Sequence, residues 1–325
     1  MTMAQSPQLP GIGVGTWAWG NQFLWGYDPA QDHQLEATFA RAVQLGLRFF
    51  DTADSYGTGR LQGRSEQLLG RFCAALPAEQ RLGLCVATKL APFPWRLGRG
   101  GFRAAFAASR QRLGGQLDRV QLHWSTARYA PWQEGPLLDG LADLVREGSV
   151  ASLGLSNFGP QRLRQVHRRL QERGVQVESL QVQLSLLATQ PLAPGGVADV
   201  CRELGIHLIA YSPLALGLLT RAPDALTPVL GSRRLLFARL QPRIGPLLVM
   251  LAAIARERQV SQASVALNWC RSHGAMPIVG LRSTEQAEAA AAATRWCLSP
   301  SEREALDAAA AQVPAAMPAN PFCSN

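Results

Sequence analysis

The chain has almost no lysine. Of its 32 lysine and arginine residues, Lys89 is the only lysine. Arginine is planar and stays charged, whereas lysine is a compact ammonium whose pKa responds to burial and to neighbouring charges. Lys89 ends an apolar run, residues 84–89 (LCVATK), which predicts a buried strand. Because a chance surface lysine would not close a buried strand, we expect an amine with a function at this position.

The sequence also lacks the patterns of disulfide, metal and membrane proteins. Its six cysteines show no CxxC spacing and no histidines at metal-ligand spacing. The N-terminus has no apolar run typical of a signal peptide, and no stretch approaches 18 uncharged apolar residues. We therefore expect a cytoplasmic protein in a reducing compartment, with no metal and no membrane span.

Acidic residues are fewer than basic ones, which raises the question of a polyanionic partner. The net charge is +9 and the pI is about 9.9. The arginines are scattered through helical patterns, however, and no basic tail or nucleic-acid motif accompanies them. The charge therefore indicates a solvated surface with an anion-binding pocket. We expect a small-molecule substrate, no nucleic acid, and a monomer or weak oligomer.

Short apolar runs alternate with segments of helical periodicity along the whole chain. Runs that are apolar throughout are typical of parallel strands buried on both faces. Eight of them predict an α/β fold, a (β/α)8 TIM barrel forming one domain over residues 1–325. Residues 8–19 are expected to form an N-terminal β-hairpin capping the barrel bottom, and residues 214–245 a long functional connection. The eight predicted strands are residues 47–53, 84–89, 120–124, 151–157, 179–185, 207–213, 275–280 and 295–298.

Helix signals lie between these runs. Apolar positions at helical spacing, with proline at the first turn or glycine after the end, predict helices over residues 32–47, 137–147, 160–173 and 245–259. The alanine-rich run 287–293 also predicts a helix. Ser299 followed by Pro300 and Glu302 predicts a helix start with a capping box.

The glycines near the N-terminus do not form a dinucleotide fingerprint. In the segment beginning at Gly11 the third glycine is out of register, and no strand-to-helix turn with a following acidic residue is present. A nucleotide would therefore bind outside a Rossmann turn. In a barrel, chemistry lies at the C-terminal ends of strands, and these ends carry Asp51 with Tyr56, then Lys89, then His123. Singly each has an ordinary structural explanation, but together they predict a catalytic site.

At these residues the chain resembles the aldo-keto reductase superfamily. FFDTADSYG, VATK and QLHW are similar to the segments that carry the family's catalytic Asp, Tyr, Lys and His. GLSNF, YSPLALGLLT and PIVGLRSTEQ are similar to its cofactor-binding segments, in the family's order. The N-terminal GTWAWGNQFLWGYD resembles a subgroup of plants and cyanobacteria, some of whose members reduce pyridoxal.

The resemblance implies NADPH/NADP+ as the cofactor and a role for each matching residue. Tyr211 would stack on the nicotinamide, and Arg282 would contact the 2′-phosphate, since a guanidinium recognises phosphate bidentately. The chain departs from the family at Ala289 and Ala290, where an acidic residue and an asparagine usually contact adenine. The implied cofactor-binding residues are Ser156, Asn157, Gln181, Tyr211, Ser212, Leu214, Gly217, Gly280, Arg282 and Gln286.

The implied reaction is reduction of an aldehyde or ketone to an alcohol. Tyr56 would donate the proton, with its pKa lowered by Lys89, and His123 would orient the carbonyl. Asp51 would keep Lys89 charged. The expected substrate is flat or aromatic, such as pyridoxal, because four tryptophans are candidates for the pocket wall: Trp19, Trp25, Trp95 and Trp124.

Two other functions fit parts of the sequence. Lys89 could form a Schiff base in an aldolase, although Asp51 and the cofactor segments argue against it. The chain could also be a nicotinamide-binding sensor or regulatory subunit with vestigial turnover, which the complete set of four catalytic residues disfavours.

Overall fold

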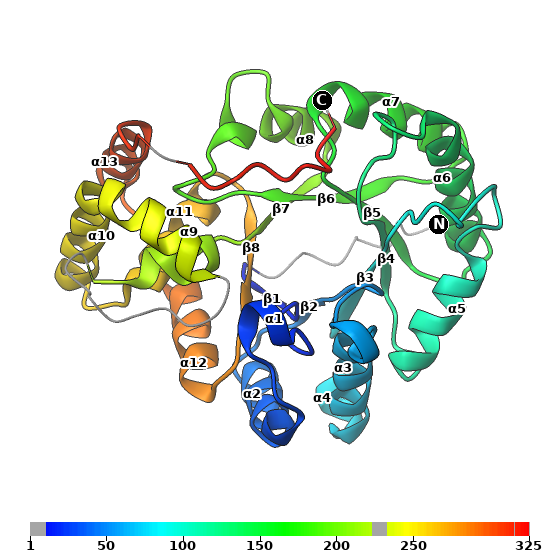
Figure 1. Cartoon of the computed structure of the whole chain (residues 1–325), viewed down its shortest axis with the longest axis horizontal. Coiled ribbons are helices and arrows are strands. Elements are labelled where there is room, and N and C mark those ends of the chain that lie inside the picture. Colours follow the sequence, from blue (N-terminus) through cyan, green and yellow to red (C-terminus); the bar gives the residue numbers. More distant parts are fainter. Residues whose placement is uncertain (1–10, 223–232, 315, 325) are drawn as a thin grey trace.

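The computed structural model describes residues 11–222, 233–314 and 316–324. Eight parallel strands form a closed barrel in which each strand pairs with its neighbours in the chain, and β8 closes onto β1 (Figure 1). The strands are β1 (Gly13–Gly15), β2 (Phe49–Asp51), β3 (Cys85–Leu90), β4 (Arg119–Leu122), β5 (Ser152–Ser156), β6 (Val177–Gln183), β7 (His207–Tyr211) and β8 (Met276–Gly280).

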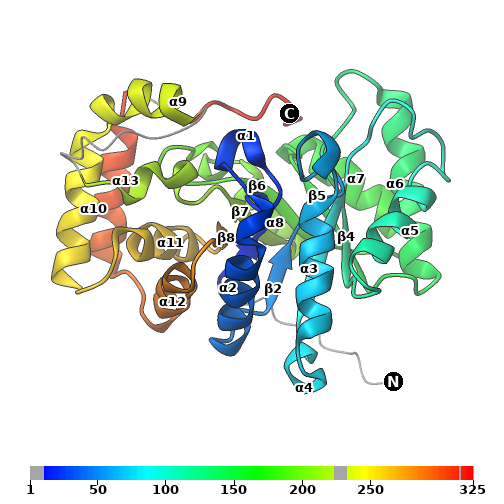
Figure 2. The same cartoon turned by 60° about the horizontal axis from the view of Figure 1, so that its bottom comes forward.

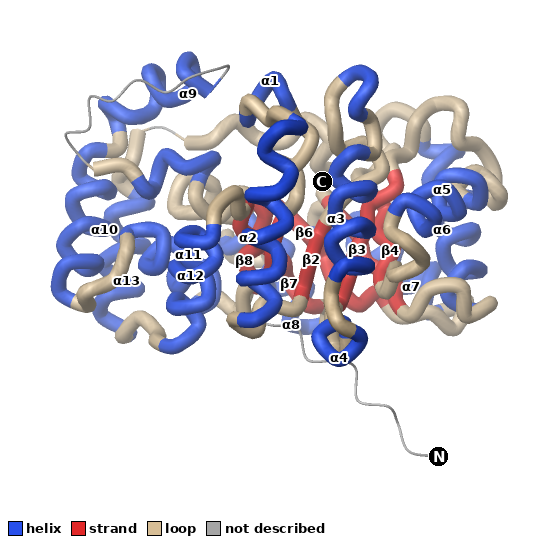
Figure 3. The backbone as a smooth tube through the Cα atoms, turned by 90° about the horizontal axis from the view of Figure 1, so that it is seen from below, coloured by secondary structure: helices blue, strands red, loops and turns tan. Residues whose placement is uncertain are grey.

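Helices surround the barrel and connect its strands (Figure 3). Two of them, α1 and α9, lie at the end where the strands terminate, and α4 lies at the opposite end. The helices are α1 (Gln22–Trp25), α2 (Asp32–Gln44), α3 (Arg64–Ala75), α4 (Ala78–Arg81), α5 (Arg103–Arg112), α6 (Pro131–Arg146), α7 (Pro160–Gln171), α8 (Val197–Leu204), α9 (Arg233–Leu240), α10 (Gly245–Glu257), α11 (Gln262–Ser272), α12 (Thr284–Ala292) and α13 (Pro300–Ala311). Six short 3-10 helices, η1 to η6, complete the described elements.

The N-terminal hairpin prediction is wrong for the residues that the structure describes. Gly13–Gly15 forms the first barrel strand, parallel to β2 and β8. Its three residues, two of them glycine, carry too little apolar pattern to reveal a strand. Packing requires a glycine at position 13, because a Cβ there would approach the side chains of Phe49 to 2.7 Å and Ile278 to 2.9 Å. Residues 8–10 lie outside the described part of the chain.

The last predicted strand, residues 295–298, is also wrong. Ala293–Arg295 forms the 3-10 helix η6, and the chain continues without regular structure to Ser299. The barrel still has eight strands, as predicted, because β1 takes the place of this strand. The first predicted strand is therefore β2, and the other six that are present are β3 to β8. The other predicted strands and helices are present with shifted ends. The capping box at Ser299 is confirmed, because its side chain and that of Glu302 each accept the other's backbone N–H.

The long connection after β7 lies beside the C-terminal ends of the strands. It contains η4 (Ala215–Thr220), α9 and η5 (Gln241–Arg243), while residues 223–232 lie outside the described part. The C-terminal segment passes over the same end of the barrel as α1 and α9 (Figure 2).

All six cysteines are free, and the described residues hold no group of three or more His, Cys, Asp or Glu that could bind a metal. No single described helix has the length and apolarity to cross a membrane. One helix pair, Arg233–Arg243 with Gly245–Glu257, meets that test only when its two members are taken together across an 84° bend.

Candidate active site

The four predicted catalytic side chains line one cavity at the C-terminal ends of adjacent strands. Asp51 ends β2, Lys89 lies one residue before the end of β3, and His123 directly follows β4. Tyr56 lies in the loop after β2, and the cavity has a volume of about 1250 Å³. Parallel pairing places these strand ends side by side, so residues far apart in sequence meet there.

Lys89 and Asp51 form a buried ion pair, each side chain being 1% exposed. Nζ of Lys89 donates to Oδ2 of Asp51 and, at 2.8 Å, to the carbonyl oxygen of Thr52. Two amides donate to the other carboxylate oxygen: Nε2 of Gln121 at 2.9 Å and Nε2 of Gln181 at 2.8 Å. A buried charge is tolerated when it is paired and hydrogen-bonded in this way. The sequence did not predict Gln121, which points into the barrel from the middle of β4.

The lysine is held in its charged form. Burial acts to lower the pKa of Lys89, but the charge of Asp51 and the hydrogen bond to its carboxylate oppose burial, and the pKa lies above its ordinary value. Its ammonium nitrogen lies 4.9 Å from the centre of the Tyr56 ring. A protonated amine has no lone pair for attack on a carbonyl, so this environment disfavours a Schiff base at Lys89.

Tyr56 is held in its protonated form. Burial raises the pKa of Tyr56 above its usual value, and the charge of Lys89 offsets that increase only in part. From the sequence we predicted a lowered pKa for Tyr56, because a nearby lysine was expected. Burial of the phenol, which raises the pKa, is a property of the fold and could not be predicted from the sequence. The structure thus keeps a phenolic proton available at neutral pH.

His123 is neutral. Burial first, and then the charge of Lys89, hold the pKa of His123 well below its usual value. A neutral imidazole carries one donor and one acceptor nitrogen. Nδ1 lies 3.3 Å from Oγ of Ser55, and when this hydroxyl donates to Nδ1 the ring hydrogen resides on Nε2. Ser55 was not predicted, although it lies next to Tyr56 in the sequence; the two rings of Tyr56 and His123 meet edge to face at 5.8 Å.

Every residue predicted to bind the cofactor also lines this cavity. Asn157, directly after β5, adopts a left-handed backbone with φ of 63°. Its Nδ2 donates to the carbonyl oxygen of His123 at 3.0 Å and to Oγ of Ser156 at 3.1 Å, while its Oδ1 accepts from the hydroxyl of Tyr211 at 2.9 Å. These bonds fix the Tyr211 ring at the end of β7, and burial raises the pKa of its phenol.

The C-terminal segment joins the same hydrogen-bond group. Nδ2 of Asn320 donates to Oδ1 of Asn157 at 3.0 Å and to the Tyr211 hydroxyl at 2.9 Å. Phe322 stacks on Trp124 with ring centres 4.7 Å apart. Figure 1 shows this segment in red, running from α13 toward the start of α7. The sequence carried no signal for these contacts, because the segment has no periodic pattern.

The turn after β7 has an unusual backbone. Ala215, Leu216 and Gly217 have φ values of 48°, 59° and 97°, and Ser212 has 52°. Left-handed conformation costs non-glycine residues about 1 kcal/mol or more each, and it persists mainly at functional sites. The turn borders the cavity through Ser212, Leu214 and Gly217, all predicted to bind the cofactor.

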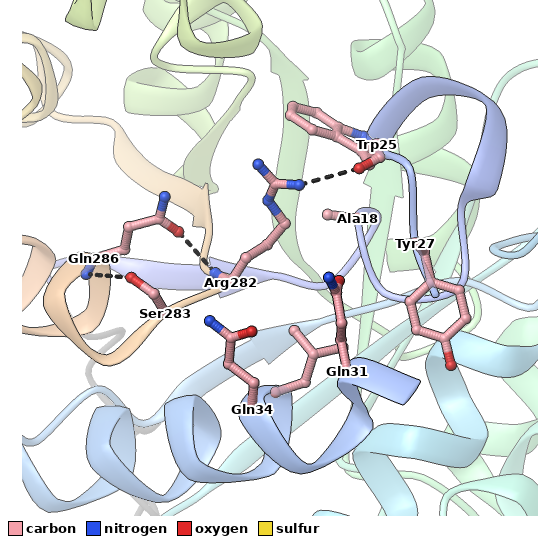
Figure 4. A pocket seen from close by; sticks show the side chains of 9 residues that line it. Ala18, Trp25, Tyr27, Gln31, Gln34, Arg282, Ser283 and Gln286 are labelled. Atoms are coloured by element: carbon pink, nitrogen blue, oxygen red, sulfur yellow. Dashed lines mark hydrogen bonds between the residues drawn. The ribbon is translucent and has the colours of Figure 1, made fainter. Parts of the chain in front are cut away.

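Arg282 lies just after β8 and forms one wall of the cavity. Gln286 Oε1 accepts from the backbone N–H of Arg282 at 2.7 Å, and Nη1 of Arg282 donates to the carbonyl oxygen of Trp25 at 3.0 Å (Figure 4). Gly280 precedes this wall. Ala289 and Ala290, where the family usually has adenine-contacting polar side chains, line the cavity as well.

The four tryptophans predicted for the pocket wall separate into three groups. Trp124 and Trp25 line the cavity. Trp19 does not line it; this side chain is fully buried, packs on Phe72 and donates from Nε1 to the carbonyl oxygen of Leu281 at 2.8 Å. Trp95 is 73% exposed and stacks on Phe93, and it is not among the residues that line the cavity. Both predictions are corrected, because apolar residue type alone could not distinguish core, surface and site.

Trp17 is a wall residue that the sequence did not single out. Its ring centre lies 6.4 Å from that of Tyr56 and 6.1 Å from that of Trp25. It lies in the same tryptophan-rich N-terminal segment as the nominated Trp19 and Trp25, and of these two only Trp25 lines the cavity.

Comparison with known proteins gives one consistent family. Residues 11–311 match the Aldo/keto reductase family. The chain is 46% identical over 319 residues to the chloroplastic pyridoxal reductase of Arabidopsis thaliana, covering 96% of this chain and 86% of that protein. It is 30% identical over 296 residues to the 6-dehydroglucose reductase of Novosphingobium aromaticivorans, covering 86% and 87% of the two chains.

Solved structures share the fold. Glycerol dehydrogenase from Gluconobacter oxydans superimposes with a TM-score of 0.77 at 24% identity, covering 98% of this chain and 96% of that one. An aldo-keto reductase from Klebsiella pneumoniae in complex with NADPH superimposes with a TM-score of 0.71 at 23% identity, covering 98% and 95%. At these identities the likeness establishes the barrel.

Proposed function

This chain belongs to the aldo/keto reductase family, and from that premise we propose that it reduces an aldehyde to an alcohol with NADPH. The proposed proton donor is Tyr56. The observation that carries this role is the charged Lys89–Asp51 pair beside a protonated tyrosine and a neutral histidine, His123, in one cavity.

Tyr56 and His123 have different roles in the proposed proton transfer. Because the pKa of His123 is held well below its usual value, the ring is neutral at neutral pH and has no extra proton to give, so it serves as a hydrogen-bond donor that orients the carbonyl oxygen. The phenol of Tyr56 gives the proton, and the ammonium of Lys89 then stabilises the resulting phenolate by its charge. Asp51 keeps that ammonium protonated throughout.

NADPH fits the residues along the rest of the cavity. A bound NADPH supplies the hydride to the carbonyl carbon. Tyr211, whose ring is fixed by its bond to Asn157, would hold the nicotinamide, with Ser156 and Gln181 beside the carboxamide. The left-handed turn at Leu216 and Gly217, which also lines the cavity, would hold the diphosphate.

We propose pyridoxal as the substrate. Support comes from the 46% identity to the Arabidopsis pyridoxal reductase and from the aromatic lining near Tyr56, contributed by Trp17, Trp124 and Phe322. Flat rings bind well between such faces. The cytoplasmic location and the monomeric or weakly oligomeric state stay predictions; the Arabidopsis relative is chloroplastic by name.

The test replaces Tyr56 by phenylalanine, which removes the proton donor and almost no volume. We expect NADPH affinity to stay within about twofold and pyridoxal reduction, followed by NADPH absorbance, to fall about 10²–10⁴-fold, the usual contribution of a general acid. Tyr27→Phe removes the same atom at a residue that does not line this cavity, where the hydroxyl bonds Asp32 and Arg64, and it should retain the parent rate.

Two results would contradict the proposal. A Tyr56→Phe enzyme within about twofold of the parent would remove Tyr56 from the chemistry. Tight NADPH binding by the unmodified protein, with no turnover of pyridoxal or of a broad aldehyde panel, would instead support the sensor or regulatory subunit.

A further inference from the structure

Gln121 contacts Asp51 without lining the active-site cavity. The residue is fully buried inside the barrel, and its Nε2 donates to Oδ1 of Asp51 at 2.9 Å. Lys89 and Gln181 also bond to this carboxylate, and both of them line the cavity. Gln121 is not among the lining residues. An effect of Gln121 on the chemistry would therefore act through Asp51.

The chemistry of this contact fixes which end of the Gln121 amide faces Asp51. A carboxylate only accepts hydrogen bonds, so the NH2 group points toward it and the carbonyl oxygen points elsewhere. That oxygen, Oε1, is buried and has no hydrogen-bond partner among the described residues. An unpaired buried acceptor is rare, lowers stability and requires an explanation. An apolar side chain of the same length would fill the position and leave no oxygen unpaired.

The neighbouring strand leaves room for the amide. The register places Gln121 of β4 between Lys89 of β3 and Gly154 of β5. A Cβ on Gly154 would lie 3.0 Å from Cγ of Gln121, 3.3 Å from its Oε1 and 2.7 Å from Oγ of Ser179. The glycine at position 154 therefore leaves open the space that the Gln121 side chain needs.

Two amides bind one oxygen of Asp51 and leave the other to Lys89. Asp51, Gln121 and Gln181 come from β2, β4 and β6, and inward side chains of alternate strands form layers in a barrel of this kind. Both Nε2 atoms donate to Oδ1, whereas Lys89 bonds to Oδ2. The two amides thus fix the rotation of the carboxylate, and they stabilise negative charge on the oxygen that does not receive the lysine.

The charge on Asp51 affects Tyr56. Burial raises the pKa of Tyr56, Lys89 lowers it, and Asp51 raises it. Two further ionisable rings face this phenol, the neutral His123, which meets it edge to face, and Tyr211, which interacts with it electrostatically. An amide N–H bonded to the carboxylate weakens the charge that opposes the lysine. The ammonium then stabilises the phenolate more strongly once the proton has left.

We propose that Gln121 is a positioning residue for the reduction, because it orients the Asp51 carboxylate toward Lys89. The lysine ammonium in turn supports the phenolate that Tyr56 becomes when it gives its proton. The inference rests on the proposed role of Tyr56 as proton donor, and it extends that role to a side chain that does not line the cavity. It also accounts for a glutamine where an apolar residue would pack without an unpaired oxygen.

The test replaces Gln121 by methionine in the full-length protein, which keeps the length and removes both the donor and the unpaired oxygen. We expect kcat for pyridoxal reduction to fall about three- to tenfold, as for the loss of one hydrogen bond, with KM for NADPH and pyridoxal within about twofold. The pKa of Tyr56 should rise, so the fall of kcat at high pH should move to higher pH. The melting temperature should change by no more than about 2 °C, because losing the bond and losing the unpaired oxygen have opposite effects on stability.

A second variant and a control accompany this test. Gln121→Glu can donate to Asp51 only while the introduced carboxyl is protonated, and adjoining carboxyls share a proton, so kcat should approach the parent value at low pH and decline as the pH rises. Gln133→Met makes the same exchange as Gln121→Met at another buried glutamine that does not line the cavity. Nε2 of Gln133 donates to the carbonyl oxygens of Phe93 at 2.8 Å and Arg96 at 2.9 Å, so this control should lower the melting temperature and leave the pH profile of kcat unchanged.

The outcomes separate this inference from the proposed function. Parent kcat and pH profile in Gln121→Met, while Tyr56→Phe loses activity, would overturn the inference and leave the function standing. A rise in KM with unchanged kcat would assign Gln121 to ligand binding and overturn it as well. Retained activity in Tyr56→Phe would contradict both proposals. If Gln121→Met fails to fold, recovery of Gln121→Glu at low pH supports the inference, and a loss that does not depend on pH overturns it.

Discussion

Lys89 shows how much depends on one side chain. Its ammonium has three hydrogen-bond directions, and the structure uses two of them, toward Asp51 and the Thr52 carbonyl, while the same nitrogen lies 4.9 Å from the Tyr56 ring centre. A guanidinium is wide and planar and cannot occupy this point between three groups in the same way. The single lysine in an arginine-rich chain is therefore explained by geometry as well as by charge.

Replacing Lys89 by arginine should keep the fold and reduce turnover. One cation would still pair with Asp51, but the close positive charge beside Tyr56 would be displaced, and Lys89 is the group that lowers the pKa of Tyr56 against burial. The Tyr56 pKa should therefore rise further. Because the reaction needs the protonated phenol, the fall of kcat at high pH should move to higher pH, with kcat reduced by about tenfold or more.

The measurements for Lys89→Arg are a pH profile of kcat and a thermal melt. Arg48→Lys, the reverse exchange at a partly buried arginine away from the cavity, controls for the change of side-chain type. A Lys89→Arg enzyme with the parent rate and pH profile would show that any cation suffices.

At the scale of single residues, the sequence predicted that Asp51, Lys89 and His123 share a site because barrel chemistry lies at strand ends. The structure places all three in one cavity, and their catalytic roles stay predictions. Gln121 and Ser55 were missed, because a glutamine inside a strand and a serine in a loop are common and gain their roles only from what they face. The direction of the Tyr56 pKa was missed for the same reason, since burial is a property of the fold.

At the scale of elements, the C-terminal segment is the part that sequence patterns described least. It has no regular structure, yet it bonds to Asn157 and Tyr211 through Asn320 and contacts Trp124 through Phe322. It is anchored at both ends: Met317 N donates to the carbonyl oxygen of Leu187 at 2.8 Å, and Ser324 Oγ accepts from Gly159 N at 3.2 Å. A periodic pattern is not needed for docking of this kind, which depends on individual contacts.

Removing the Phe322 ring should affect aromatic substrates selectively. Phe322 is 45% exposed, so Phe322→Ala should change the melting temperature little. Aromatic pairs contribute about 0.5–1.5 kcal/mol, which corresponds to a rise in KM for pyridoxal of about two- to tenfold. Steady-state kinetics with pyridoxal and a short aliphatic aldehyde test this. The aliphatic KM should stay within about twofold, and Phe322→Tyr should behave as the parent; equal changes for both substrates would contradict the role.

At the scale of the whole molecule, arginine holds the outer ring of helices together. Most of these ion pairs join neighbouring helices rather than turns of one helix, and several are exposed. Examples are Arg41–Glu288 between α2 and α12, Arg164–Glu203 between α7 and α8, Arg169–Asp139 between α7 and α6, and Arg258–Glu302 between the ends of α10 and α13. The fork geometry of arginine suits such bidentate links, which accounts for its excess over lysine.

The ion pairs between the outer helices make the free energy of unfolding depend on pH in the acidic range. The hydrogen bonds from Arg258 lower the pKa of Glu302 from its ordinary 4.5 to about 2. A carboxyl with a depressed folded pKa contributes stability above its unfolded pKa and loses it as the pH falls through the folded pKa. The contribution of Glu302 is therefore complete above about 4.5 and lost toward about 2.

Glu302→Gln should reduce the free energy of unfolding at pH 7 by about 1 kcal/mol, the upper range for exposed pairs, and by much less at pH 2.5. Gln keeps the capping geometry at Ser299, so the variant isolates the charge. Urea unfolding at the two pH values measures this, with Glu304→Gln, exposed on the same helix, as the control for net charge. Equal losses at both pH values would assign the effect to the cap rather than the ion pair.

The sequence by itself determined the barrel and the family, because both depend on local pattern: apolar runs and short motifs in order. It also predicted which strand ends and segments line one cavity, and their roles in catalysis and cofactor binding stay predictions. The tertiary structure decided what depends on contacts between distant segments. It made Gly13–Gly15 a strand by packing it against Phe49 and Ile278, and it gave residues 295–298 no strand partner. It also buried Trp19 and brought Asn320 to the site. A sequence pattern cannot distinguish one tryptophan from another, or one amide or arginine from another. Their roles depend on which residues surround them in the folded chain.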